Sequence, residues 1–383
     1  MAVPGTVARR DKDSERDLIA TMKVLVLPGD GIGPEIVGPT VEVLEAADAA
    51  YGLGLELETA DIGFAGLARE GTTLPQAVLD RIPEVGGVIL GPVSHYDYPP
   101  RHEGGINPSA ELRVRFDLFS NIRPCRSRAD LTVLRAPMDL VLVRENTEGF
   151  YSDRNMHAGS GEFMPDADNA FSIRKISARG CERVARTAFE LAGRRRRKVT
   201  AVHKANVLEL SDGLFLREVR KVAEAFPDVQ LEELIVDAAA AALIRRPDTF
   251  DVIVTTNMFG DILSDEAAEL SGSLGLGGSL NAGQDVGVAQ AQHGSAPDIA
   301  GRGIANPTSL ILSAAMLLDW RGRRDGDDAL VAAAAGIESA VETVLGEPGS
   351  RTRDLGGHLG TAEFAAHVVA RLTSDSRAAA SGN

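Results

Sequence analysis

Residues 23–35 read KVLVLPGDGIGPE, and this stretch decides the class of fold. The apolar run predicts a short buried strand, the glycines predict a tight turn, and Pro34 suits the first turn of a helix that extends to about Ala50. The same order recurs, with strands expected at 55–59, 85–90, 139–143, 170–176, 199–203, 230–236 and 252–255, and helices at 73–81, 178–192, 206–225, 262–270, 306–318, 328–345 and 361–372. This alternation predicts an α/β protein with a substantially parallel sheet.

The glycine turn lacks the spacing of a Rossmann dinucleotide-binding turn. Gly29, Gly31 and Gly33 are spaced G-x-G-x-G and precede Pro34, whereas the Rossmann turn has G-x-G-x-x-G running into its helix. The acidic residues 45 and 48 do follow, but the helix continues through them, and a ribose-binding acid belongs at the end of a second strand. The spacing therefore favours a structural turn over a Rossmann motif.

Composition limits the classes of partner. The 383 residues include 40 Lys+Arg and 55 Asp+Glu, a net charge of −15, which argues against binding to a nucleic-acid backbone. The basic run 194–197 is accordingly interpreted as a solvated helix C-terminus. Two cysteines cannot form a disulfide framework, and no apolar run reaches the roughly 20 residues of a membrane span. We expect a soluble cytoplasmic protein without a membrane partner, with unstructured tails at 1–21 and 374–383.

Two carboxylates four residues apart are the first candidate for chemistry. Asp261 and Asp265 would lie on one face of a helix, where like charges repel unless a cation lies between them. A hard divalent ion takes such oxygen ligands. Acids in a first helical turn are also favoured by the helix dipole, so the segment alone leaves both explanations open.

Basic residues near strand and loop ends are the second candidate. Arg113, Arg123 and Arg144 could hold a di- or tricarboxylate, although each alone is better explained by a surface ion pair. Lys204 and Asn206 follow a predicted strand, where α/β proteins place ligand-facing loops. The loop 293–307, rich in glycine and small residues, would allow a nucleotide to approach the backbone, but it could also be an ordinary surface loop.

Taken together, six segments resemble the β-decarboxylating dehydrogenases, the isocitrate/isopropylmalate dehydrogenase family. They are LVLPGDGIGPE at 25–35, NIRP at 121–124, VRENTEGFY at 143–151, HKANV at 203–207, NMFGDILSD at 257–265 and the loop 293–307. The resemblance implies a two-domain, non-Rossmann α/β fold with parallel or mixed sheets and helices on both sides. It implies a large coenzyme-binding domain of residues 22–118 and 272–373, and a small domain of residues 119–271 that carries the metal ligands and the dimer interface.

The resemblance also implies a role for each matching residue, in an active site that a homodimer completes. Tyr151 looks like the acid, and Lys204, from the other subunit, like the base. Mg²⁺ or Mn²⁺ would be held by Asp261 and Asp265 with Asp237 of the opposing subunit. The substrate-binding residues would be Asn107, Ser109, Arg113, Arg123, Arg144 and Asn206, and the coenzyme-binding residues Gln290, His293, Gly294, Ser295, Ala296, Asp298, Ile299 and Asn306.

The residues at a few single positions indicate which coenzyme and which type of substrate to expect. Asp298 can accept hydrogen bonds from both ribose hydroxyls but repels a 2′-phosphate, and NADP-linked relatives carry Lys-Tyr at 298–299, so we expect NAD. Ser109 and Ala110 stand where isopropylmalate enzymes have paired leucines, which favours a polar or carboxylated substituent on the substrate. Gln290 stands where many relatives carry a glutamate near the nicotinamide, so the charge is lost there while the amide can still form a hydrogen bond.

The expected function is thus NAD- and metal-dependent oxidative decarboxylation of a 3-substituted malate, isocitrate-like or with another polar substituent. Isopropylmalate, tartrate and D-malate remain alternative substrates. A non-catalytic regulatory subunit is the alternative from a different class, but such subunits tend to lose the base, the acid or the metal ligands. A metal-independent Rossmann dehydrogenase is the third alternative.

Overall fold

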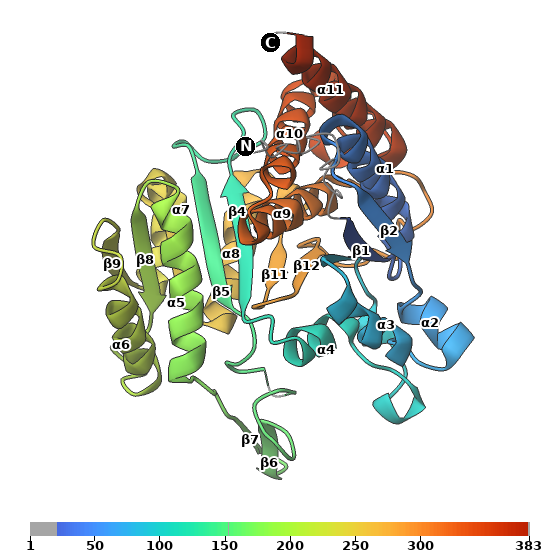
Figure 1. The fold of residues 1–383 in the computed structure, drawn as a ribbon. Helices are drawn as coiled ribbons and strands as arrows, with labels where there is room; N and C mark the ends of the chain where they lie inside the picture. The colour runs from blue at the N-terminus through green and yellow to red at the C-terminus, as the bar shows by residue number, and fades with distance from the viewer. Residues whose placement is uncertain (1–20, 152, 382–383) are drawn as a thin grey trace, which may run out of the picture.

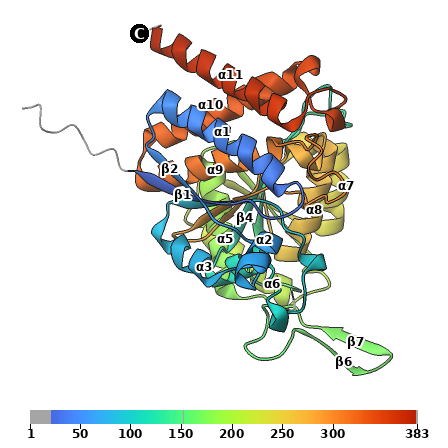
Figure 2. The same cartoon turned by 90° about the vertical axis from the view of Figure 1, so that its right-hand side faces the viewer.

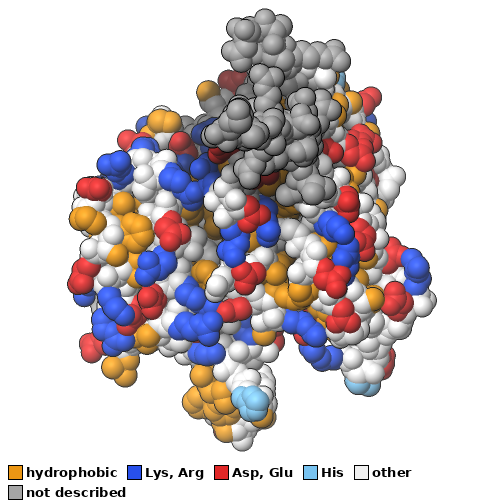
Figure 3. Space-filling model, in the orientation of Figure 1, with side chains coloured by type: hydrophobic (Ala, Val, Ile, Leu, Met, Phe, Trp, Pro, Cys, Tyr) orange, Lys and Arg blue, Asp and Glu red, His pale blue; other side chains and the backbone are white. Residues whose placement is uncertain are grey.

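The computed structural model describes residues 21–151 and 153–381, and its centre is one ten-stranded sheet (Figure 1). The strands lie in the order β2-β1-β3-β12-β11-β4-β5-β10-β8-β9. Their bounds are β1 Met22–Leu27, β2 Leu55–Thr59, β3 Gly87–Leu90, β4 Ser120–Arg126, β5 Asp139–Glu145, β8 Lys198–His203, β9 Gln230–Ile235, β10 Val252–Thr255, β11 Leu280–Ala282 and β12 Gly287–Gln290. A separate hairpin of β6 (Glu162–Asp166) and β7 (Asn169–Ser172) projects from the body (Figure 1, Figure 2 and Figure 3).

The sheet consists of two parallel parts joined by antiparallel strands. Strands β2, β1, β3 and β12 pair in parallel, as do β5, β10, β8 and β9. Between them the pairs β12–β11, β11–β4 and β4–β5 are antiparallel, so the two parallel parts run in opposite directions. The predicted α/β architecture with a mixed sheet is therefore confirmed.

Helices cover both faces of this sheet. Their bounds are α1 Gly33–Tyr51, α2 Gly63–Glu70, α3 Gln76–Arg81, α4 Pro108–Arg115, α5 Ala178–Gly193, α6 Ser211–Ala223, α7 Val236–Arg245, α8 Asn257–Ser271, α9 Thr308–Asp325, α10 Asp328–Gly346 and α11 Thr361–Ser381. Buried side chains of α1, α5, α9 and α10 form one core with the sheet face that carries Val24 and Val143. Alternate residues such as Leu25 and Leu142 belong to two smaller cores on the other face.

Two sequence-based expectations about the fold are wrong. Helix α11 continues to Ser381, so residues 374–381 are not an unstructured tail; residues 1–20 lie outside the described part. Helix α8 begins at Asn257 rather than 262, so Asp261 and Asp265 lie beyond its first turn, and the dipole explanation for them is weakened. The basic run does follow the C-terminus of α5 with residues 194, 196 and 197 exposed, while Arg195 pairs with Asp139 at 2.9 Å and with Asp251 at 2.8 Å.

Several elements were not expected from the sequence. Strand β4 reads SNIRPCR, too polar and too interrupted by proline to resemble a core strand, and β11 has only three residues.

Helix α10 is, within the described residues, the one helix whose length and composition would allow it to cross a membrane. Its apolar face is buried in the core shared with α1, α9 and α11, as in a core helix (Figure 2).

Candidate active site

The alternation of side chains along the two central strands creates the site. On β4, Asn121 and Arg123 contact residues of β11 and α8, whereas Ile122 lies on the opposite face with the large core. On β5, Arg144 likewise points to α8, while Val143 belongs to the large core. Polar residues at alternate positions of an otherwise apolar strand therefore place two buried guanidinium groups against the face of α8.

Arg144, Tyr151 and Asp261 form one connected group. Arg144 is fully buried; it pairs with Asp261, donates from Nη2 to the Tyr151 hydroxyl at 2.5 Å, and donates from Nε to Asn257 Oδ1 at 2.9 Å. The Tyr151 hydroxyl in turn donates to Asp261 Oδ2 at 2.9 Å. Gly260 makes this approach possible, because a Cβ there would lie 2.6 Å from Arg144 Cγ. The fold thus brings together the predicted acid Tyr151, the predicted substrate ligand Arg144 and the predicted metal ligand Asp261.

Arg123 holds the second carboxylate of the helix. Its Nη1 donates to Asp265 Oδ1 at 2.9 Å and to Ser264 Oγ at 2.7 Å, and its Nε donates to Asn121 Oδ1 at 2.7 Å. Arg123 also lies 3.6 Å from Asp261, so both acids share the same positive surroundings.

Arg113 completes an arginine cluster, which we define as Arg113, Arg123, Arg144 and Arg154. Arg113 follows Ser109 on α4, and no acidic residue within the described ranges forms an ion pair with it. Its Nε is buried without a hydrogen-bond partner. Burial lowers the pKa of Arg113, and the positive charges of Arg144, Arg123 and Arg154 lower it further. A buried cation surrounded by like charges is costly, so the cluster is arranged to receive an anion.

The two carboxylates of α8 differ electrostatically. Burial acts to raise the pKa of Asp261, but Arg144 and Arg123 outweigh it, so this pKa lies below its usual value. Burial raises the pKa of Asp265, and Arg123 offsets this only partly. The side chains are 42% and 52% exposed, respectively, so oxygen atoms of both remain open to an incoming ion.

Two carboxylates on one helix fit a hard divalent cation. Mg²⁺ accepts one or two carboxylates and fills its remaining positions with water or substrate oxygens. Among the described residues no three His, Cys, Asp or Glu side chains come together to hold a metal. Asp261 and Asp265 are therefore the carboxylates that this site could offer to such an ion.

Lys204 and Asp237 form an exposed pair apart from this group. Lys204 follows β8, Asp237 lies in the first turn of α7, and Nζ lies 2.6 Å from Oδ1. Their side chains are 28% and 69% exposed. The Lys204 hydrogen bond holds the pKa of Asp237 below its usual value. Asn206, two residues further on, is exposed.

The predicted coenzyme loop packs against the glycine turn that follows β1. The Ile32 N–H donates to the carbonyl of Ser295 at 2.8 Å, and a Cβ on Gly31 would lie 2.0 Å from the same oxygen. Ser94 donates to the Ser295 hydroxyl at 2.8 Å, and Ala296 has a φ of 37°, in the left-handed region. The glycine turn is therefore structural, and it supports the loop backbone.

The other loop residues divide into structural and available ones. Asn306 is engaged at both ends, donating to Asp354 at 3.0 Å and accepting from the Thr308 N–H at 3.0 Å. The Nε2 atom of His293 is buried without a partner, and burial lowers the pKa of this imidazole. Gly294 and Asp298 are exposed and Ile299 is half-buried. The loop thus offers Asp298 and His293 to a ligand, whereas Asn306 shapes its end.

Ser109, which is expected to contact the variable substituent of the substrate, is hydrogen-bonded to the predicted coenzyme-binding residue Gln290. Ser109 donates to Gln290 Oε1 at 3.0 Å, and Asn281 lies 3.4 Å from the same oxygen. Asn107 accepts the Ala110 N–H at 3.2 Å as the N-cap of α4. Gln290 therefore connects α4 to the central strands.

Sequence reasoning missed three residues that support the site. Arg154 joins the arginine cluster, lies 5.0 Å from the Tyr151 ring centroid, and could have been noticed three positions after that tyrosine. Glu35 accepts from the Ala305 N–H at 2.9 Å and holds the end of the coenzyme loop. Asp30 accepts from the Phe64 and Ser94 N–H groups at 2.8 and 3.0 Å. Nothing in the sequence around Glu35 or Asp30 predicts such distant partners.

The fold and the matches to known proteins define a decarboxylating dehydrogenase. Residues 23–368 match the family described as isocitrate/isopropylmalate dehydrogenase, and the chain belongs to that family. It is 43% identical over 354 residues to the isocitrate/homoisocitrate dehydrogenase of Thermus thermophilus, covering 92% of this chain and 99% of that protein. It is 41% identical over 353 residues to a 3-isopropylmalate dehydrogenase of Methanothermobacter thermautotrophicus, with the same shares covered.

A solved structure supports the same conclusion about the fold. The crystal structure of isocitrate dehydrogenase from Methylococcus capsulatus has a TM-score of 0.79 and 40% sequence identity, covering 92% of this chain and 99% of that one. The resemblance inferred from the six sequence motifs is therefore confirmed.

Proposed function

We propose that this chain catalyses NAD- and divalent-metal-dependent oxidative decarboxylation of a 3-substituted malate with a polar or carboxylated substituent. The observation that carries the proposal is Arg113, a half-buried arginine that has no acidic ion-pair partner in the described residues and whose Nε atom is buried without a hydrogen-bond partner, next to three further arginines. Such a cluster suits the two or three carboxylates of this substrate class, because guanidinium groups bind carboxylates through paired hydrogen bonds.

Tyr151 and Lys204 have the chemistry that the reaction requires. Lys204 Nζ, in its neutral form, would accept the proton of the C2 hydroxyl while the hydrogen on C2 is transferred as hydride to NAD⁺. The bond from C3 to its carboxylate then breaks, CO₂ departs, and the electron pair remains as an enolate. Burial raises the pKa of Tyr151, with Arg144 opposing and Asp261 reinforcing the shift, so its hydroxyl keeps a proton at neutral pH to give to C3.

A bound Mg²⁺ or Mn²⁺ would lower the pKa of the substrate hydroxyl and stabilise the enolate oxygen. Asp261 and Asp265 would hold it together with Asp237 of a second copy. Arg144 and Arg123 orient the two carboxylates of α8 through their inner oxygens. The carboxylates therefore need little rearrangement to receive a cation.

A homodimer with shared active sites is supported by exposed apolar side chains on the elements that carry Lys204, Asp237 and Asp261. Leu210 is 91% exposed on the segment after β8, with Val207 at 65%, Ile244 on α7 at 57% and Ile262 on α8 at 60%. The projecting hairpin also exposes Phe163 and Phe171, whose rings stack at 5.3 Å. Surfaces of this kind are typical of contacts between subunits.

NAD is favoured by Asp298, whose exposed carboxylate has room to accept ribose hydroxyls and would repel a 2′-phosphate. The polar substituent is favoured by Ser109 and its hydrogen bond to Gln290, which leave no apolar pair at this position. A non-catalytic subunit is disfavoured because Tyr151, Lys204 and all three predicted metal ligands are present. A cytoplasmic location is part of the same proposal.

The test is a substrate screen with the purified protein, NAD and Mg²⁺, following NADH formation with isocitrate, homoisocitrate, isopropylmalate, D-malate and tartrate. We expect the highest kcat/KM for a carboxylated substrate, loss of turnover with EDTA and its return with Mg²⁺. A preference for isopropylmalate would overturn the substrate assignment, and equal kcat/KM for NADP would overturn the coenzyme assignment. Turnover that EDTA leaves unchanged would contradict the metal requirement.

A further inference from the structure

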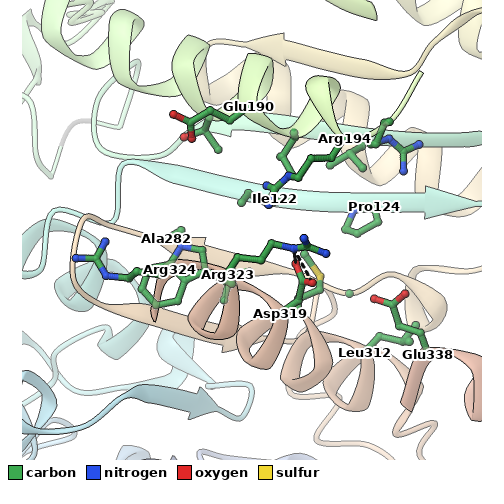
Figure 4. A pocket seen from close by; sticks show the side chains of 18 of the residues that line it. Ile122, Pro124, Glu190, Arg194, Ala282, Leu312, Asp319, Arg323, Arg324 and Glu338 are labelled. Atoms are coloured by element: carbon green, nitrogen blue, oxygen red, sulfur yellow. Dashed lines mark hydrogen bonds and ion pairs between the residues drawn. The ribbon is translucent and has the colours of Figure 1, made fainter. Parts of the chain in front are cut away.

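A cavity lies on the face of the central strands that is opposite to the arginine cluster. Its volume is about 670 Å³, within the range of small-molecule sites. One wall is α5 with the residues that follow it, the other is α9 with part of α10, and β4 and β11 form the floor (Figure 4).

Strand alternation separates this cavity from the active site. Ile122 and Pro124 of β4 line the cavity, whereas Arg123 between them contacts Asp265 on α8. On β11, Leu280 and Ala282 line the cavity, while the intervening residue 281 bonds to Asn121. The same strands thus present one face to this cavity and the other face to the active-site residues.

The walls carry an excess of positive charge. Eight arginines and five acidic residues line the cavity, in a chain whose net charge is −15. Arg194 projects from the α5 side and Arg323 from the α9 side (Figure 4). A positive cleft in an acidic protein concentrates small anions.

The two facing arginines are differently paired. Arg323 is bound by Asp319 on its own helix at 2.8 Å, whereas no ion pair to Arg194 occurs among the described residues. Burial lowers the pKa of Arg194, and the charge of Arg323 lowers it further, against Asp319 and Glu190. An anion between the two walls would remove this repulsion and give Arg194 a partner.

Apolar side chains line part of the floor and part of the α9 wall. Ile122, Pro124 and Leu280 line the floor, and Met316 and Trp320 line the α9 wall. A fully hydrated inorganic anion would leave these side chains unused. A ligand with an apolar body and an anionic group would cover them while its charge reaches the arginines.

We propose that this cleft between α5 and α9 binds a small organic anion with an aromatic or aliphatic body, held from opposite walls by Arg194 and Arg323. The site is independent of the proposed catalytic function, because none of the residues assigned to that function lines it.

The test uses anilinonaphthalene sulfonate, which has an aromatic body and one anionic group. Trp320 is the single tryptophan of the chain and lines the cavity, so energy transfer from it reports a probe bound there. We expect saturable transfer with one probe per chain, which saturating NAD leaves unchanged. Displacement of the probe by NAD, or the absence of saturable transfer, would overturn the proposal.

Charge-neutral variants identify the binding residues. Loss of a hydrogen bond to a charged group corresponds to about a tenfold weaker affinity, so Arg194→Gln and Arg323→Gln should each raise the probe Kd by about this factor. Arg321→Gln is the matched control, because this arginine lies on α9, pairs with Asp325 four residues on, and is not part of the cavity lining. Equal Kd values for all three folded variants, judged by circular dichroism, would contradict the assignment. Because only binding is measured, the result does not depend on turnover.

Discussion

The buried half-site and the exposed pair contain the same kinds of charged groups, but the chain holds them in opposite ways. We define the buried half-site as Arg113, Arg123, Arg144, Tyr151, Asp261 and Asp265; the name refers to the buried arginines 123 and 144, because the two acids that they hold are themselves 42% and 52% exposed. Its acids are held by arginines of neighbouring strands in the same chain. Lys204 and Asp237 pair only with each other through their side chains among the described residues, at 2.6 Å, with Asp237 largely exposed.

This difference separates groups that are positioned from groups that are available. The half-site acids are fixed by buried partners, so they can be arranged before any ligand arrives. An exposed ion pair contributes little to stability, and its members can change partners at small cost. The comparison therefore suggests that Lys204 and Asp237 serve the buried half-site of a second copy.

The largest expected effect comes from Lys204→Met, which removes the proposed base without disturbing a core contact. General-base catalysis contributes about 10²–10⁴-fold to the rate, so kcat should fall by that order while the Tm stays unchanged. Tyr151→Phe should also lose turnover, because it removes the proposed proton donor. Steady-state kinetics and thermal unfolding measure both. A Lys204→Met enzyme with near-normal kcat would show that the exposed pair is only structural.

Mixing the two inactive variants tests whether the site is shared. After subunit exchange, a mixed dimer would contain one site built from two intact halves, so about a quarter of all sites should recover. No recovery in a mixture that has demonstrably exchanged subunits would place both residues in the site of one chain. In that case the buried half-site and the exposed pair would belong to one active site within a single chain, and not to a site shared by two chains.

The next prediction concerns how much stability the fold loses by holding Arg113 without an acidic partner. Arg113→Leu removes a buried charge that lacks an acidic partner, so the variant should be more stable, with a higher Tm. It should also lose a charged contact to the substrate, which corresponds to an increase in KM of about 10–100-fold. Thermal unfolding and kinetics measure the two changes. Arg217→Leu is the control, because Arg217 is exposed on α6 and pairs with its neighbour Glu218. A lower Tm for Arg113→Leu would mean that Arg113 stabilises the apo fold.

The third test sharpens the claim that the half-site depends on packing. A methyl group at position 260 would push α8 away from β5 and displace Arg144, so Gly260→Ala should destabilise the protein by about 1–3 kcal/mol. Gly213→Ala is the matched control on α6, since a Cβ there meets nothing within 4 Å and should be neutral or slightly stabilising. Urea unfolding compares the two. Equal stabilities would show that α8 does not need the close contact at Gly260.

These residues also show what the sequence could and could not reveal. The i, i+4 spacing of Asp261 and Asp265 is a local property, and it predicted a shared helix face that the structure confirms. The pairing of Arg123 with Asp265 depends on a contact between strand β4 and helix α8, 142 residues apart. Because β4 is polar and contains a proline, its pattern did not predict a strand, and the central part of the sheet could not be derived from periodicity.

The helix boundaries were missed for a related reason. The sequence predicted a start at 262 for α8, but the helix begins at Asn257, whose side chain bonds to Arg144 and to the Glu148 carbonyl. Residues that a propensity reading assigns to a loop are held in the helix by tertiary contacts. The six family motifs, by contrast, identified the family correctly, because motif residues are constrained by chemistry as well as by local structure.

The smallest expected effect asks whether the coenzyme loop is held within the chain, as the buried half-site is. Glu35 Oε1 accepts from the Ala305 N–H at 2.9 Å and from the Thr361 hydroxyl at 2.8 Å. Burial acts to raise the pKa of Glu35, but these hydrogen bonds outweigh it and hold the pKa below its usual value. The ionised carboxylate therefore stabilises the fold at neutral pH by about 1 kcal/mol, and Glu35→Gln should lose that amount.

The pH dependence of this loss distinguishes a charge effect from a packing effect. Because the folded-state pKa is lower than the unfolded one, the contribution is complete above the unfolded pKa and disappears as the pH falls through the folded pKa. The difference in free energy of unfolding between Glu35→Gln and the wild type should thus shrink in acid, as urea titrations at neutral and acid pH would show. Glu42→Gln, an exposed position on the same helix, should show no difference at either pH. If the loss of stability in Glu35→Gln stays constant with pH, the shape of the side chain rather than its charge holds the loop. The loop would then differ from the buried half-site, where pairs of opposite charges position the side chains.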